Sequence, residues 1–282
     1  MNLACATCPV RDSAACSVLD EAERAVTAAA GRTRTLKRGE TLFAAGDDNA
    51  ACATLVSGAL KVSATDIDGN EQILALVHPA GFIGELFAPF AQHDVVALTE
   101  SQLCTFAKAD LHRAVDAYPA LTKALLRRSQ EDLHATRSLL ELTGNANAET
   151  RLAALIYDFA RAASQSPCHP VAQFDLPLSR GEIANMLGLT IETVSRKLGD
   201  LEATGAIRRI GKRGIELIDP AHLQALSGRS REEAGPSQPA SAAIVTTATP
   251  QSSTRTGRIK TCVAASLALS GPVLVMMPLP AK

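Results

Sequence analysis

The chain has 282 residues, 46% of them hydrophobic and 20% charged, and its formal net charge is −1. This length allows two modest domains with real cores and a tail. The charge excludes nucleic-acid binding through a global positive field, so any such binding depends on local basic residues. Aromatic residues are only 3% and tryptophan is absent, which argues against stacking on single strands or sugars.

The cysteine content points to a cytoplasmic protein with a metal, a cluster or a redox function. There are seven cysteines, and no secretory signal precedes them. Thiols in the cytoplasm are kept reduced, so a disulfide framework is not expected.

Residues 1–20 form a cysteine-rich arm. Cys5, Cys8 and Cys16 follow a C-x2-C-x7-C spacing, and thiolates two residues apart are able to share one metal centre. One ligand is missing for either a tetrahedral zinc or a cuboidal iron–sulfur cluster. We expect Cys104, on a predicted strand, to supply it.

Cys52 is the alternative fourth ligand, although either residue would also suit a small buried apolar position. Cys168 and Cys262 have no partners at useful spacing and are interpreted as incidental. Spacing alone does not separate zinc from iron–sulfur. Because the fourth ligand is distant in sequence, the centre would clip the arm to the body and release it on oxidation.

A β-domain is predicted next, within a sensor domain assigned to residues 21–115. Residues 33–108 contain short apolar runs separated by glycines, and Asp68-Gly69-Asn70 is a hairpin signal. This pattern favours a small sandwich or roll.

A long helix is expected from Ala120 to about Thr143, within a segment assigned to residues 116–144. Pro119 breaks the chain just before this helix starts. Three leucines recur at intervals of seven residues: Leu126, Leu133 and Leu140. This is the spacing of a coiled-coil seam, here half polar and therefore weak. The alternative is a helix whose leucines pack on its own domain. Gly144–Asn145 is interpreted as a hinge, after which a helix resumes over residues 149–165.

Residues 178–201 predict two short helices joined by a tight turn at Gly188, with Thr190 as the N-cap of the second helix. Val194, Leu198 and Leu201 share one face, which is expected to be buried. Another face carries a polar set: Glu192, Ser195 and Arg196. This is the layout of a helix-turn-helix whose second helix enters the DNA major groove. The alternative is an ordinary helical hairpin with a solvated face.

A basic hairpin over residues 207–218 follows and completes a winged domain assigned to residues 145–228. The residues expected on the DNA backbone are Thr190, Arg180, Lys197, Arg208, Arg209, Lys212 and Arg213. Cations at these places suit phosphate contacts beside the groove, although a simply solvated hairpin has the same pattern.

The remaining residues 229–282 form an extension of different composition. Residues 229–258 are rich in Ser, Thr, Pro and Ala and predict disorder. Residues 261–281 are apolar, but Gly271-Pro272 and Pro278 interrupt them, which disfavours a membrane span and a tethered sensor.

The residues up to about 228 resemble the CRP/FNR superfamily of bacterial transcription regulators. The segments KRGETLFAAGD, GNEQI, TRLAALIYDF and LSRGEIANMLGLTIETVSRKLGDLEATGAI are most similar to the FNR branch, and the cysteine arrangement is similar to that of its FnrL/FnrN-like oxygen-responsive members. The resemblance implies an α+β fold with an N-terminal β-roll, a long dimerisation helix and a C-terminal winged helix-turn-helix.

The resemblance also implies roles for individual residues. Cys5, Cys8, Cys16 and Cys104 would hold a four-iron–four-sulfur cluster. An intact cluster under anaerobic conditions would favour a homodimer that controls anaerobic or microaerobic genes. The base-reading residues of a TTGAT-N4-ATCAA-like palindrome would be Glu192, Ser195 and Arg196, since arginine forks onto guanine and glutamate accepts from cytosine. The possible RNA polymerase contact would be Glu85, Leu86, Phe87 and Ala88.

Three other classes of function were weighed. Cyclic AMP is not expected, because the stretch 92–96 offers Asp94 and no arginine to a phosphate. A regulator with structural zinc, or a redox cysteine site, and another effector, such as haem-borne nitric oxide, is the alternative to an iron–sulfur sensor. An enzyme is not expected, because the sequence has no Ser–His–acid, phosphate-loop or dinucleotide signature.

Overall fold

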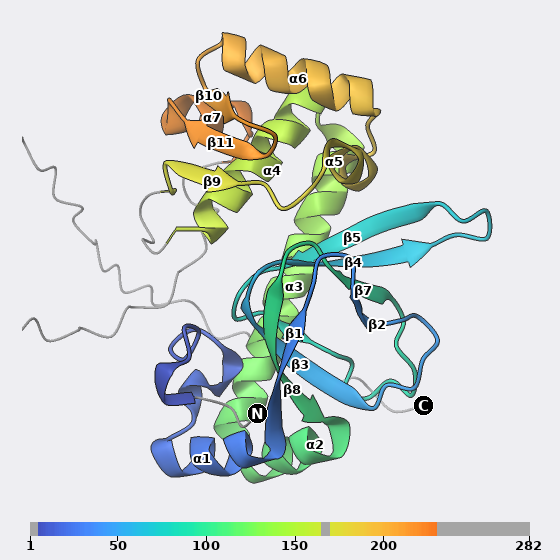
Figure 1. Ribbon diagram of the computed structural model, residues 1–282, viewed down its shortest axis with the longest axis vertical. Helices are drawn as coiled ribbons and strands as arrows, with labels where there is room; N and C mark the ends of the chain where they lie inside the picture. Colours follow the sequence, from blue (N-terminus) through green and yellow to red (C-terminus); the bar gives the residue numbers. More distant parts are fainter. Residues whose placement is uncertain (1–4, 165–169, 230–282) are drawn as a thin grey trace, which may run out of the picture. The chain divides into compact units, whose positions relative to one another are not determined.

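The computed structural model describes residues 5–164 and 170–229. They form a β-roll, a long helix and a C-terminal helical region with a small sheet, as Figure 1 shows, and the predicted α+β fold is confirmed. Cys168, Cys262 and the stretches predicted to be disordered or apolar after residue 229 lie outside the described residues. No helix in the described part of the chain is long and apolar enough to cross a membrane.

The N-terminal arm consists of two short 3-10 turns, η1 (Cys5–Thr7) and η2 (Ala15–Val18), and leads into helix α1 (Glu21–Ala30). Asp20 and Glu23 form a capping box at the start of α1. This helix was not predicted, although an Asp-x-x-Glu capping signal precedes its alanine-rich run.

Two four-stranded antiparallel sheets make the β-roll, with strand orders β1-β8-β3-β6 and β2-β7-β4-β5. The predicted Asp68-Gly69-Asn70 turn joins β4 to β5. The apolar side chains between the sheets include Leu36, Leu55, Leu60, Ile83 and Leu103. The strands are β1 (Gly31–Leu36), β2 (Thr41–Phe43), β3 (Ala51–Ser57), β4 (Leu60–Thr65), β5 (Glu71–Val77), β6 (Phe82–Ile83), β7 (Asp94–Ala97) and β8 (Ser101–Ala107).

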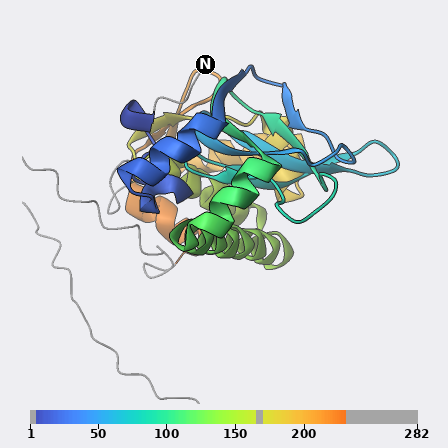
Figure 2. The ribbon, with the colours of Figure 1, turned by 90° about the horizontal axis from the view of Figure 1, so that it is seen from below.

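Two helices follow the roll. Helix α2 (Lys108–Ala117) ends before Pro119, which occupies the first turn of the long helix α3 (Pro119–Asn145). Figure 2 shows α1 and α2 lying together where α3 begins. The predicted long helix is therefore confirmed. The predicted hinge at Gly144–Asn145 is wrong, because the helix continues through both residues.

The chain breaks one residue later than expected. The Asn147 side chain accepts a hydrogen bond from the Thr150 amide and caps helix α4 (Ala148–Ala162). A side-chain cap satisfies a backbone donor that would otherwise have no partner, so it decides where the new helix starts.

The C-terminal region packs α4, α5 (Arg180–Leu187), α6 (Ile191–Ala203) and α7 (Pro220–Leu226) with a three-stranded sheet of order β10-β11-β9. The strands are β9 (Gln173–Asp175), β10 (Ile207–Ile210) and β11 (Gly214–Leu217). Strand β9 was not predicted. Ile218 was expected to extend β11, but it lies beyond the strand with 45% of its surface exposed.

Helix α5 contacts the edge strand β5 of the roll. The Asn185 side chain accepts a hydrogen bond from the Ile73 amide at 2.7 Å and donates to the Glu71 carbonyl oxygen. Arg38 and Glu182 form an ion pair of 3.0 Å beside it. Ile73 also belongs to the apolar core around α4, α5 and α6. The edge of the roll is thereby covered, and one core reaches from the roll into the helical region.

Candidate nucleic-acid interface and thiol site

Strand alternation determines where Cys104 points. Cys104 lies on β8, between Thr33 of β1 and Thr54 of β3. Its neighbour Leu103 is fully buried between the two sheets. Since successive side chains of a strand point to opposite faces, Cys104 lies on the outer face of this sheet.

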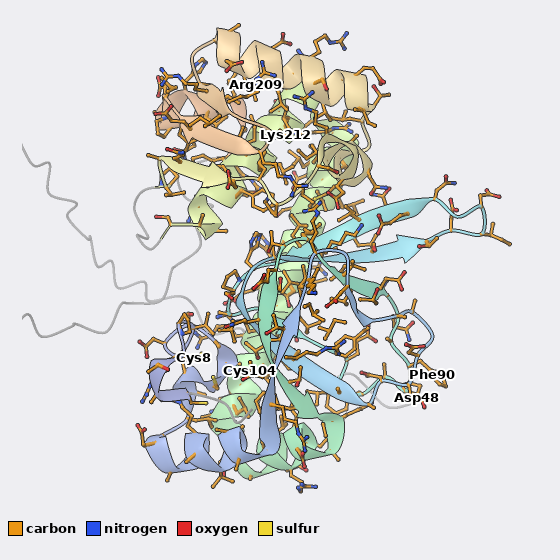
Figure 3. The ribbon with its side chains drawn as sticks, viewed as in Figure 1. Cys8, Asp48, Phe90, Cys104, Arg209 and Lys212 are labelled. Carbon is orange, nitrogen blue, oxygen red and sulfur yellow. The ribbon has the colours of Figure 1, made fainter. Side chains whose placement is uncertain are left out.

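The N-terminal arm covers that outer face. Cys8, Cys16 and Cys104 pack around one small group of buried apolar residues: Val10, Ala14, Val56 and Ala80. Figure 3 labels Cys8 on the arm and Cys104 on β8. We call Cys5, Cys8, Cys16 and Cys104 the thiol site.

The charges of these thiols act on one another. Burial, together with the thiolate charges of Cys8, Cys5 and Cys16, raises the pKa of Cys104 to about 12. Burial also raises the pKa of Cys5 and of Cys16, again with a contribution from Cys8. Three of the predicted ligands, Cys8, Cys16 and Cys104, thus share one apolar cluster, and Cys5 is near enough to act on the others electrostatically. All five cysteines among the described residues are free thiols.

Cys52 belongs to a different environment. Its exposed fraction is 0%, and it packs with Leu111, Leu121 and Leu125 of α2 and α3. Burial raises its pKa to about 11, opposed by Lys108, and no other thiol contributes. The geometry thus favours Cys104 over Cys52 as the fourth member of the site.

The thiols are not arranged around a single ion. Across residues 5–164 and 170–229, no three His, Cys, Asp or Glu side chains are grouped so as to hold one metal. Four thiolates around zinc would all lie about 2.3 Å from the same atom. Thiolates that bind different corners of an iron–sulfur cluster stand farther apart. The described residues therefore hold no preformed site for one zinc ion.

The helix-turn-helix is held by local caps. Ser179 and Glu182 form a capping box at the start of α5, and Gly188 ends it in the left-handed conformation with φ of 62°. The Thr190 side chain accepts a hydrogen bond from the Thr193 amide and caps α6, as predicted. The sequence interpretation of this segment is confirmed in its local detail.

Helix α6 has the two faces that the spacing predicted. Val194, Leu198 and Leu201 are buried against the core. Glu192 and Arg196 are exposed on the other side, and Ser195 is half-buried. Arg180 of α5 lies near this face, with Nη1 3.4 Å from the Ser195 hydroxyl. These side chains are available to a groove of DNA without any change in the core.

The basic residues of the wing, the hairpin formed by β10 and β11, differ in whether a carboxylate of the chain already pairs with them. Arg208 pairs with Glu216 at 2.9 Å, and Arg209 pairs with Glu202 at 2.6 Å. Lys212, labelled with Arg209 in Figure 3, is exposed at the turn between β10 and β11. Arg213 is exposed as well and donates to the Pro177 carbonyl oxygen.

Lys197 is the least available of the predicted phosphate contacts. Its ammonium lies 2.7 Å from Asp200 and 3.7 Å from Glu149 of α4. Two carboxylates already neutralise this lysine, so we assign it to the packing of α6 on α4. Lys212 and Arg213 are better placed for DNA phosphates.

The three seam leucines of α3 face outward. Leu126, Leu133 and Leu140 expose 61%, 49% and 72% of their surface. The alternative, in which they pack on their own domain, is wrong. Large apolar side chains at seven-residue intervals on an exposed helix face favour pairing with a partner helix.

Comparisons with known proteins identify the family. Residues 33–118 match the cyclic nucleotide-binding domain, and residues 150–226 match the Crp-like helix-turn-helix domain. The transcriptional activator protein FnrL of Cereibacter sphaeroides is 32% identical over 78% of this chain and 90% of its own length. The chain belongs to the CRP/FNR family of transcription regulators.

Further CRP/FNR relatives agree. The nitrogen fixation regulation protein FixK of Bradyrhizobium diazoefficiens is 33% identical over 79% of this chain and 93% of its own. The structure of FixK2 from Bradyrhizobium japonicum superposes with a TM-score of 0.65, at 23% identity, over 71% of this chain and 98% of that one. Regulators of the CRP/FNR family bind DNA and function as dimers.

The region that matches the cyclic nucleotide-binding domain has its own polar arrangement here. Asp94 of β7, where an anion would need a cation, accepts a hydrogen bond from the Ala45 amide at 2.9 Å. A cavity of about 610 Å³ opens nearby between the roll, α3 and α4, with Val62, His78 and Phe159 in its lining. Sequence reasoning did not anticipate this cavity.

Hydrogen bonds fix the backbone of the loop that was predicted to contact RNA polymerase, residues 85–88. The Asn49 side chain donates to the carbonyl oxygens of Glu85 and Ala88, and the Leu86 carbonyl oxygen lies 2.9 Å from His112 Nε2. Phe87 projects from this loop with 86% of its surface exposed. The backbone is thus fixed, and the Phe87 ring lies edge-to-face with the His112 ring, their centroids 5.5 Å apart.

Proposed function

We propose that this chain is an oxygen-responsive transcription activator of the FNR type. The observation that carries the proposal is the thiol site, in which four free thiols from two distant segments meet where the arm packs on the sheet. In this proposal Cys5, Cys8, Cys16 and Cys104 hold a four-iron–four-sulfur cluster in the cytoplasm, where thiols stay reduced.

The donor chemistry supports such a cluster. Four thiols are the ligand set of a four-iron–four-sulfur cluster, whose iron atoms bind each cysteine as a thiolate. When bound, a cluster of this kind supplies an inorganic centre that is sensitive to oxygen. The chain's own contribution is to hold the arm against β8 by ligands on both segments.

Contacts of the arm provide a route from the thiol site to α3. Ala15 and Leu19 pack against Leu121 and Leu125 of that helix. Arg128 of α3 also donates a hydrogen bond to the Ser13 carbonyl oxygen. In our proposal, a ligated arm stays in place and supports the face of α3 that pairs with a second copy.

The homodimer then determines operator binding. Two copies of α6 would read the half-sites of a TTGAT-N4-ATCAA-like palindrome, with Glu192, Ser195 and Arg196 on the bases. Each good base contact contributes about 1–3 kcal/mol of discrimination. Chains that separate in air would lose half of these contacts, so operator affinity would fall.

Activation is supported by the relative FnrL, which is a transcriptional activator protein. We propose that the loop from Glu85 to Ala88 contacts RNA polymerase, with Phe87 as the apolar anchor. Aromatic side chains that project from a fixed backbone are typical of such contacts.

The experiment that tests the function is anaerobic reconstitution followed by exposure to air. We expect four irons and four sulfides per chain, sedimentation as a dimer and binding to the palindrome, all lost in air. Cys104→Ala should take up no intact cluster, whereas the matched variant Cys52→Ala should behave like the unmodified protein. A single zinc ion without sulfide, or a dimer that stays on the operator after complete cluster loss, would contradict the proposal.

A further inference from the structure

Arg24 of α1 is a buried arginine beside the thiol site. Only 9% of it is exposed. Its Nη2 donates to the carbonyl oxygens of Leu19 at 2.9 Å, Ser17 at 3.3 Å and Cys16 at 3.4 Å. Arginine is rarely buried unless several partners compensate it. Here all three partners belong to the turn that carries Cys16, so the guanidinium fixes that turn to α1.

Arg24 also carries a buried donor that lacks an acceptor. Its Nε–H is buried and has no hydrogen-bond partner in the described part of the chain, where Arg229 is the other residue with such an atom. Buried polar groups in folded proteins are nearly always hydrogen-bonded. Because the same side chain bonds the Cys16 carbonyl oxygen, its unsatisfied donor points to an acceptor that belongs to the occupied site, and thiolate or inorganic sulfide is such an acceptor.

The charge of Arg24 is also not neutralised nearby. Among the described ion pairs none includes Arg24, whereas Arg11, the other cation near Cys5, pairs with exposed Glu21 at 2.9 Å. The Arg24 Nη2 lies 3.4 Å from the Cys16 carbonyl oxygen, so this positive charge stands beside one proposed ligand of the site.

We propose that Arg24 is the positioning residue of the thiol site: it braces the Cys16 turn and presents a positive charge and a hydrogen-bond donor to the bound group. This inference rests on the proposed function. Hydrogen bonds to the sulfurs and nearby charge set the reduction potential of an iron–sulfur centre. Arg24 would raise that potential and slow the loss of the centre in air.

The brace is tested first, in the iron-free full-length protein. Hydrogen–deuterium exchange is measured over residues 14–19 in the unmodified protein, Arg24→Lys, Arg24→Met and the control Arg11→Met. We expect faster exchange in both Arg24 variants, more so in Arg24→Met, and no change in Arg11→Met. Circular dichroism confirms that each variant is folded, and Arg24→Lys serves as the working variant if Arg24→Met is not.

The effect of the Arg24 charge on the reduction potential is tested on anaerobically reconstituted protein. A redox titration followed by absorbance should give a more negative midpoint potential for Arg24→Met, with Arg24→Lys close to the unmodified protein because it keeps the charge. Loss of the cluster absorbance in air should be about 10-fold faster in Arg24→Met, in the range found for groups that support metal ligands.

The outcomes separate the two proposals. An unchanged exchange rate or an unchanged potential in Arg24→Met overturns the role of Arg24. Equal potentials in Arg24→Lys and Arg24→Met also overturn it, because a merely structural brace would behave in that way. If the unmodified protein takes up no iron, the proposed function fails and the tuning role fails with it, while the exchange data still decide whether Arg24 braces the turn.

Discussion

The helix-turn-helix and the thiol site are built in opposite ways. The helix-turn-helix is one continuous segment whose caps and turn come from its own residues, Ser179, Gly188 and Thr190. The thiol site joins the arm to Cys104, far along the chain, and its members meet only through packing. Local caps fix where the helices of the helix-turn-helix begin and end, whereas the members of the thiol site depend on packing between distant segments. In the proposed function, this difference separates the part that reads DNA from the part that responds to oxygen.

Breaking the leucine seam on α3 should have the largest effect on operator affinity. It separates the two copies of the helix-turn-helix and leaves the helix-turn-helix and the thiol site of each chain intact. Leu133→Asp places a charge on a leucine with 49% of its surface exposed, which lies in none of the buried apolar clusters of the described residues. We expect a monomer by sedimentation and operator affinity reduced roughly 10³-fold, toward the non-specific level. Iron uptake should be normal. The control is Arg137→Asp, also exposed but off the leucine positions. A Leu133→Asp protein that remains dimeric would contradict the seam.

Removing a base contact should have the next largest effect and should leave the thiol site unchanged. Arg196→Ala truncates an exposed side chain of α6. The expected loss is about 1–3 kcal/mol of discrimination per half-site, concentrated at one base pair. Titration of operators with single substitutions measures it. Arg208→Ala, in the paired wing position, should weaken all sequences alike. Uniform weakening by Arg196→Ala would show that it contacts phosphate instead.

Removing the N-cap of α6 tests whether the stability of the helix-turn-helix is independent of the thiol site. Thr190→Ala deletes the side chain that accepts the Thr193 amide. We expect a loss of about 1 kcal/mol in the free energy of unfolding, measured with urea, and no change in the rate of cluster loss. Thr193→Ala keeps that cap and is the matched control. An altered rate of cluster loss in Thr190→Ala would mean that the two regions are not separable.

Loosening the arm should have the smallest effect on stability. Arg128→Gln removes a charged donor from the Ser13 carbonyl oxygen, at a cost of roughly 1 kcal/mol for a partly exposed bond. The thiols should still take up iron. Sedimentation should show a weaker dimer, because the arm supports α3 less well. Arg127→Gln changes an exposed neighbour as the control. Unchanged dimerisation would show that the bond from Arg128 to Ser13 does not connect the thiol site to the pairing of α3.

The sequence was sufficient wherever one segment carried its own signals. The turn at Gly188 and the cap at Thr190 were predicted, and α3 was expected from Ala120, one residue after its start at Pro119, because each of these signals depends on residues within a few positions. Helix α1 and strand β9 were missed. Strand β9 is three residues long and exists only because β11 pairs with it. The hinge was misplaced because the Asn147 cap outweighed Gly144.

The same division holds for the site. The C-x2-C-x7-C spacing indicated three of the four thiols, but the sequence left Cys104 and Cys52 as alternatives. Strand alternation places both on the outer face of the same sheet, and only packing separated them, since Cys104 packs with Val10 and Ala14 of the arm whereas Cys52 packs with Leu111, Leu121 and Leu125. Arg24 gave no signal, because an arginine in a short helix is ordinary until its burial is known.

Local chemistry thus determined the helices, turns and the reading face of this protein from the sequence alone, since backbone caps and side-chain periodicity act over a few residues. Tertiary structure decided which thiols meet, which face of α3 stays open and where Arg24 places its charge. Those contacts join segments that are distant along the chain, and their energies exist only once the arm, the sheet and α3 are packed together.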